Sequence, residues 1–261
     1  MLGARYVGTG GRILNSELGT SCKLAPAGEG HKQKNMQELF IWFYSNQNML
    51  PKGVPSSATV SVTEEFFPKN PNKFKRGTWW NYSRILNPFP VEEKYRLPEE
   101  LILVVKRQKK VLFDYLDYRV GIKIFSEKLL DLLIANGLNP NYDKAKLTVI
   151  NTKGENIAEQ PYFYVRFGSF DDKLFTYDDT LKIASKDFPD DFLYTDLKLK
   201  ESSERNVFVF GNAEVDGYNC YTDTLIITRS LKEEIEKICY APEIYTLESF
   251  PIVYNNSIIY P

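Results

Sequence analysis

The chain has 261 residues, of which 43% are hydrophobic and 14% aromatic, so it can bury a substantial core and cannot be disordered throughout. Its 33 basic and 34 acidic residues leave a net charge of −1, which argues against a dedicated nucleic-acid binder. No run of about 18 apolar residues occurs, so the sequence predicts no membrane span. Three scattered cysteines and the lack of an apolar secretory stretch indicate reduced thiols and a cytoplasmic protein.

The first 35 residues differ from the rest of the chain. They contain seven of the 15 glycines, one aromatic residue, Tyr6, and the single histidine, His31. Such a stretch buries too little surface to offset the entropy lost on ordering. We therefore predict a loosely ordered leader over 1–35 that need not be native, with Met36 as a candidate start, and one domain over 36–261. The alternative is an N-terminal hairpin, RYVGTGGRIL, that packs on the body.

After Met36, strand signals mix with few helix signals. The basic segment KRQKK (106–110) lies between two apolar runs and indicates an exposed turn that joins a strand pair. Five prolines over 66–98 argue against a long regular element there. Strands are predicted at 39–44, 59–62, 101–105, 111–115, 121–125, 146–150, 162–167, 207–210 and 224–228.

Two principal helices are predicted, at about 126–136 and 230–240. The first follows Ser126, a good N-cap residue, and ends before Gly137. The second has capping-box spacing from Ser230 to Glu233. The apolar faces directed at the core are Leu129, Leu130, Leu133 and Ile134 in the first helix, and Leu231, Ile235 and Ile238 in the second. Strands and helices do not alternate regularly, which predicts an α+β fold with a mixed, mainly antiparallel sheet.

The sequence lacks the residues that most kinds of catalytic site need. Nucleophile systems built on Ser or Cys use a histidine base, and His31 lies in the predicted leader. Cys220 and Cys239 stand alone, unlike the paired ligands of zinc sites, and no phosphate-binding glycine loop occurs. We therefore predict a protein that is not an enzyme, with no catalytic residue, cofactor or metal.

The stretch 170–204 is acidic, with ten carboxylates against five lysines. Three Asp doublets lie within it, but neighbouring residues on a strand point to opposite faces, so each doublet offers one ligand to a site. A solvated surface region is the simplest interpretation. The alternatives are a catalytic or metal-binding carboxylate pair and a partner-binding face, for which the candidates are Asp187, Asp190, Asp191 and Asp196.

Trp79 and Trp80, close to Tyr82 and Arg84, form the most conspicuous aromatic group. Trp, Tyr and Arg dominate the energetic centres of protein interfaces, and aromatic rings also stack on nucleic-acid bases. Burial of one tryptophan in the core is the simplest expectation. We nominate both Trp79 and Trp80 as candidate partner-binding residues.

Three motifs, taken in order, resemble a known group of proteins: W-x-Y-S-R at 80–84, FSEKLLDLL at 125–133 and TDTLIITRSLKEEIEK at 222–237. In this order they resemble the large immunity proteins of bacterial polymorphic-toxin and contact-dependent inhibition systems. The resemblance covers about residues 36–255. It implies an α+β fold, no enzymatic activity, and neutralisation of a cognate toxin domain, often a nuclease, by tight protein–protein binding. It carries over no toxin-binding position. A carboxylate-based hydrolase and a single-strand nucleic-acid binder remain the alternatives.

Overall fold

The computed structural model describes residues 37–45, 50–52, 54, 60–82, 89–119, 121–186, 191–210, 218–219 and 224–257. The chain divides into two units, Met1–Asn35 and Met36–Pro261, and every described residue belongs to the second. The predicted leader and hairpin lie outside the described residues, as do Cys22, His31 and Cys220. Among the described residues no helix is long and apolar enough to cross a membrane.

The larger of two main sheets has six strands in the order β2-β3-β6-β7-β5-β4. Neighbouring strands are antiparallel, except that β3 and β6 run parallel. Its strands are β2 (Val60–Thr63), β3 (Glu100–Val105), β4 (Tyr115–Arg119), β5 (Ile122–Ser126), β6 (Tyr142–Ile150) and β7 (Tyr162–Phe167).

This six-stranded sheet curls so that its two edge strands approach each other. The backbone N–H of Val62, in β2, donates to the hydroxyl of Tyr118, in β4, over 3.0 Å. The concave face holds a core to which both edge strands contribute, with Tyr162 and Tyr164 of β7 at its centre. Alternation along β7 places Arg166 on the same face, and that side chain is buried.

The second main sheet is antiparallel throughout, with strand order β12-β14-β1-β15. Its strands are β1 (Leu39–Trp42), β12 (Val207–Phe210), β14 (Thr224–Thr228) and β15 (Ile244–Thr246). Two small sheets accompany it, built from β8 (Phe175–Thr176) with β11 (Lys198–Leu199), and from β9 (Lys182–Ala184), β10 (Asp191–Tyr194) and β13 (Tyr218–Asn219).

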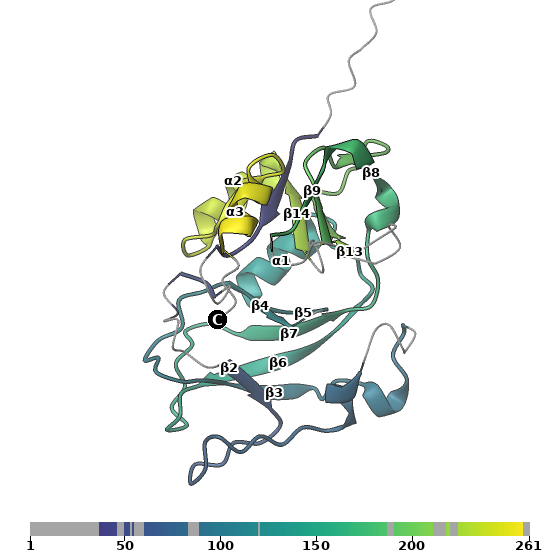
Figure 1. The fold of residues 1–261 in the computed structure, drawn as a ribbon. Helices are drawn as coiled ribbons and strands as arrows, with labels where there is room; N and C mark the ends of the chain where they lie inside the picture. The colour runs from purple at the N-terminus through teal and green to yellow at the C-terminus, as the bar shows by residue number, and fades with distance from the viewer. Residues whose placement is uncertain are drawn as a thin grey trace, which may run out of the picture. The chain divides into compact units, whose positions relative to one another are not determined.

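Helix α1 (Glu127–Ala135) lies between the two main sheets (Figure 1). Ser126 begins it, because its hydroxyl accepts the Leu129 N–H, and Gly137 follows its end with a φ of 85°. Its buried leucines share one core with α2 (Arg229–Ile238) and with residues from both sheets, such as Phe125 and Phe40. Burial between two sheets explains why the apolar spacing alone predicted α1 correctly.

Helix α3 (Phe250–Ser257) covers the other face of the four-stranded sheet and was not predicted. Phe250 and Tyr254 pack there against the same core as Phe208 and Ile226. The α+β class and the mainly antiparallel strands are confirmed, but the structure has three helices where two were predicted. Pro251 stands in the first turn of this third helix, where proline is tolerated.

Three local predictions were wrong. The runs 101–105 and 111–115 do not pair, because β3 bonds to β2 and β6 instead. Helix α2 begins at Arg229 after Thr228, so the capping box predicted from Ser230 is not at its start. Ile134 and Ile238 are 43% and 38% exposed, because each lies at the margin of its helix face.

Candidate functional site

Of the two nominated tryptophans, Trp79 belongs to the core and Trp80 reaches the surface. They lie on a short 3-10 helix, Thr78–Asn81. Trp79 is 4% exposed, and its indole N–H donates to Glu64 Oε1 over 2.6 Å. Trp80 is half-buried, with its ring perpendicular to that of Trp79. Of this pair, only Trp80 is accessible to a partner.

Two arginine side chains stack on Trp80. The guanidinium carbon of Arg76 lies 3.6 Å from the centre of the Trp80 ring, and that of Arg119 lies 4.1 Å from it. Tyr118 meets the same ring at a steep angle, and burial raises the pKa of its phenol although Val62, Arg76 and Arg119 oppose the shift. We call Arg76, Trp80, Tyr118 and Arg119 the arginine–tryptophan cluster.

The acidic candidates are only partly described. Asp187 and Asp190 lie outside the described residues, and Asp191 begins β10 with no side chain described. Asp196 is half-buried and accepts the backbone N–H of Asp178 with both carboxylate oxygens, each at 3.0 Å. The partner-binding role of these four residues stays a prediction.

Two acids of the same stretch are buried, contrary to the expected solvated surface. Asp171 and Asp172 are 4% and 6% exposed. Asp171 binds Arg205 with both oxygens and also accepts the Val209 N–H, which joins this stretch to β12. A carboxylate held by so many donors serves the fold, because its lone pairs are already occupied.

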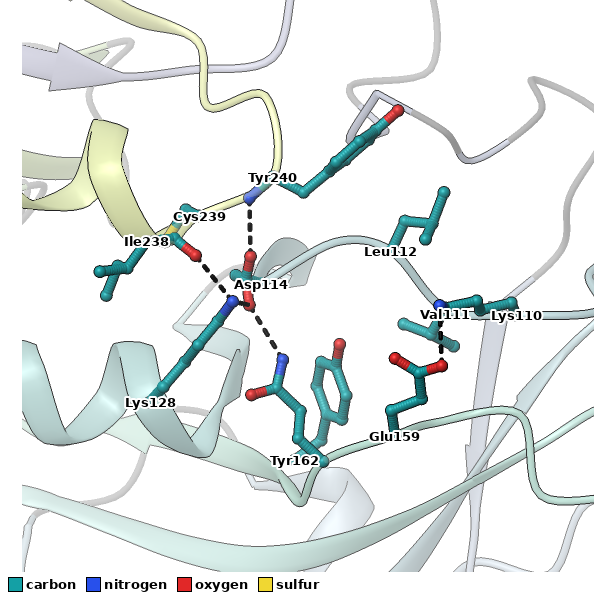
Figure 2. A pocket seen from close by; sticks show the side chains of 11 residues that line it. Lys110, Val111, Leu112, Asp114, Lys128, Glu159, Tyr162, Ile238, Cys239 and Tyr240 are labelled. Carbon is teal, nitrogen blue, oxygen red and sulfur yellow. Dashed lines mark hydrogen bonds and ion pairs between the residues drawn. The ribbon is translucent and has the colours of Figure 1, made fainter.

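A cavity of about 330 Å³ opens where the start of β4, the start of α1 and the end of α2 meet (Figure 2). Three side chains around it are apolar and exposed: Leu112, Ile238 and Tyr240, the last 48% exposed. Lys110 and Glu159 form an ion pair of 2.7 Å on its other side. The cavity therefore combines an apolar, accessible rim with a neutralised charged pair. We call Leu112, Ile238 and Tyr240 the cavity rim.

Asp114 lies buried beside the cavity and accepts from four donors (Figure 2). Its Oδ1 lies 2.9 Å from Ser126 Oγ, 3.1 Å from Gln160 Nε2 and 3.0 Å from Lys128 Nζ. Its Oδ2 accepts the Tyr240 N–H over 2.8 Å. Lys128 also donates to the Ile238 carbonyl at the end of α2. These bonds tie α1, α2 and β4 together and fix the position of the rim.

Cys239 also lines the cavity, and its thiol is not activated. Burial, reinforced by the charge of Asp114, raises the pKa of the Cys239 thiol to about 12. Nucleophilic cysteines need a depressed pKa, since the thiolate is the reactive form. Neither Cys239 nor Asp114 is thus poised for chemistry at the cavity. Among the described residues, no group of three His, Cys, Asp or Glu side chains is placed to hold a metal ion.

A family model described as immunity protein 43 matches residues 46–261, which is most of the chain. This chain belongs to the immunity protein 43 family. The family assignment confirms the resemblance to immunity proteins of toxin systems that the sequence motifs indicated. No curated protein matches the chain.

Several exposed residues around the cavity and the cluster were not identified from the sequence. Leu112 and Tyr240 look like ordinary apolar positions beside a strand and a helix, and no local signal marks them as exposed. Arg119 ends a strand, where arginine is common. Their grouping arises from tertiary structure, so the one usable signal in the sequence was the tryptophan pair.

Proposed function

We propose that this immunity protein neutralises a cognate bacterial toxin domain in the cytoplasm by binding it directly, without an enzymatic step. The observation that carries the proposal is the cavity with its exposed apolar rim. Apolar side chains that are already held in place lose little entropy when a partner covers them. Desolvated apolar and aromatic anchors of this kind supply most of the energy of protein interfaces.

The groups beside the rim support contact and not catalysis. Asp114 is saturated by its four donors, and the Cys239 thiol stays protonated at neutral pH. The same bonds hold the backbone at two of the three rim residues, because Lys128 donates to the carbonyl of Ile238 and Asp114 accepts the N–H of Tyr240. A preorganised apolar surface favours tight binding.

A growth-rescue experiment tests the proposal. The probe is the carboxyl-terminal domain of the protein encoded by the neighbouring upstream gene, expressed from an inducible promoter in a bacterial host. We expect this domain to stop growth, co-expression of the immunity protein to restore it, and the two purified proteins to form a stable complex. Rescue without a complex would contradict direct binding, and a domain that kills in the presence of the immunity protein would contradict the pairing.

A further inference from the structure

We propose that the arginine–tryptophan cluster binds an acidic segment of the cognate toxin domain. This inference rests on the proposed function and adds a location and a partner chemistry to it. Arg119 is the central residue, because it is exposed and its guanidinium stacks on Trp80 while forming no ion pair with any described carboxylate.

The lysines near the cluster are paired with acids, whereas the two guanidinium groups are not. Lys123 is buried and pairs with Asp117 at 2.8 Å, and Lys75 pairs with Glu65 at 3.3 Å. In the described part of the chain, neither Arg76 nor Arg119 has such a partner. Two positive charges over one ring, with no counter-ion among the described residues, favour a carboxylate-bearing partner.

Arg76 has a structural task that Arg119 lacks. Its Nε donates to the Val62 carbonyl over 3.0 Å, at the outer edge of β2. Together with Tyr118, which accepts the Val62 N–H, it occupies backbone groups that an edge strand would otherwise expose. Within the described structure, Arg119 makes no comparable side-chain hydrogen bond to a backbone group, and it follows a register shift in β4 after Asp117. Such bulges redirect side chains and recur at functional positions.

Stacking leaves the guanidinium donors available. A guanidinium that lies over an aromatic ring uses its flat face, so the N–H groups at its edge can still grip a carboxylate with two parallel bonds. Trp80 also shields one side of the ion pair from water, which strengthens it. This arrangement favours the planar carboxylates of Asp and Glu.

A nucleic-acid backbone fits the same surface less well. Glu64, Glu65 and Asp117 lie close to the cluster in the fold, through Trp79, Lys75 and Lys123 respectively. A single carboxylate bound by Arg119 adds one negative charge beside these acids, whereas a run of phosphates adds one for every nucleotide. The whole chain is also slightly acidic, with a formal charge of −1.

The cluster and the cavity rim lie at opposite ends of one edge strand. Leu112 precedes β4 and Arg119 ends it, so an extended chain between them spans roughly 23 Å. A standard protein interface covers about 800 Å² on each partner, which is wide enough to include both ends. A toxin domain whose interface extends along β4 would contact the rim with apolar side chains and the cluster with acidic ones.

The test compares charge-reversal variants in a binding titration with the purified toxin domain of the rescue experiment. We expect Arg119→Glu to weaken binding by about 30-fold or more and to reduce the dependence of Kd on salt. Arg119→Lys, which keeps the charge and loses the flat fork, should weaken binding less. Lys146→Glu makes the same change in charge at another exposed position, outside the acidic stretch, and should leave Kd within about twofold.

The outcomes separate this inference from the proposed function. If the wild type binds the toxin domain and Arg119→Glu binds it with the same affinity, the role of the cluster is overturned and the proposed toxin binding is not. No binding by the wild type would overturn both. A 20-nucleotide single-stranded DNA serves as the second probe, and if Arg119→Glu lost binding to the DNA but kept binding to the toxin domain, the cluster would be a nucleic-acid site instead.

Discussion

Arg205 holds Asp171 in a two-pronged ion pair, with Nη1 2.8 Å from Oδ1 and Nη2 2.7 Å from Oδ2. The Nε of the same arginine donates to the Gly137 carbonyl, after the end of α1. Asp171 also accepts the Val209 N–H in β12. The pair thus connects the acidic stretch, the helix between the sheets and the four-stranded sheet.

We expect Asp171→Ala to lower the free energy of unfolding by about 3 kcal/mol, because it leaves the Arg205 charge and the Val209 N–H without their acceptor. Urea denaturation followed by circular dichroism measures the change. Asp179→Ala is the matched control, since Asp179 is 67% exposed and its ion pair with Lys182 is long, at 3.5 Å. A change below 1 kcal/mol for Asp171→Ala would show that the pair is not important for stability.

Two neighbouring residues of the α1 apolar face, Leu130 and Ile134, should differ sharply in their contribution to stability. Leu130 is buried between the sheets, so Leu130→Ala should cost about 2–5 kcal/mol of unfolding free energy through lost contacts and a cavity. Ile134→Ala should cost less, about 1 kcal/mol or below, because 43% of that residue is exposed to water. Equal costs in chemical denaturation would contradict the placement of α1.

Stability should decline at alkaline pH. Burial raises the pKa of Cys239 to about 12 and also raises the pKa values of Tyr44, Tyr162 and Tyr164 above that of an ordinary phenol. In the unfolded chain these groups lose their protons near pH 9–10, so above that range the unfolded state binds fewer protons than the folded state. The stability that these groups contribute to the folded protein is therefore intact below about pH 9 and falls as the pH rises toward 12.

Thermal melting between pH 7 and 11 checks the alkaline decline. We expect Tm to be nearly constant up to about pH 9 as far as these groups are concerned, and then to fall. A Cys239→Ala variant should show a shallower fall, because one of the shifted groups is gone. A Tm that rises between pH 9 and 11 would contradict the prediction, because thiol and phenol groups that stay neutral in the folded protein can only make Tm fall in that range.

The cavity rim should contribute to toxin binding more than to folding. Tyr240→Ala removes an exposed ring but keeps the backbone N–H that bonds to Asp114. We expect about 10- to 100-fold weaker binding of the toxin domain, with the melting temperature almost unchanged. Ile252→Ala, at a 67% exposed position of α3, is the matched control and should bind like the wild type. Equal affinities for both variants would remove the rim from the interface.

The acidic stretch gives a separate prediction about association rate. If Asp187, Asp190 and Asp191 form a partner-binding face, reversing all three to Lys should slow association with a toxin surface of opposite charge. Stopped-flow mixing at low and high salt measures this rate. An unchanged rate constant at low salt would remove these residues from the encounter surface, while the arginine–tryptophan cluster could still determine the dissociation rate.

Several elements could be predicted because their signals are local. Strands 162–167, 207–210 and 224–228 were predicted with the bounds that the structure has, since each is a short, dense run of apolar residues. Ser126 and Gly137 delimited α1 through capping chemistry. The pairing of β3 with β6 was not predictable in this way, because partner choice depends on contacts 46 residues apart, between Leu101 and Leu147.

By itself the sequence determined the α+β class, the positions of α1 and α2 and most strands, because apolar periodicity and capping residues act within a few positions of the chain. Its motifs also pointed to the immunity-protein family. Only the tertiary structure decided that Trp79 is core while Trp80 is surface, that Asp171 is buried, and that Arg76 and Arg119 stack on one ring. Exposure and charge pairing depend on which distant segments meet, so no local pattern in the sequence could fix them.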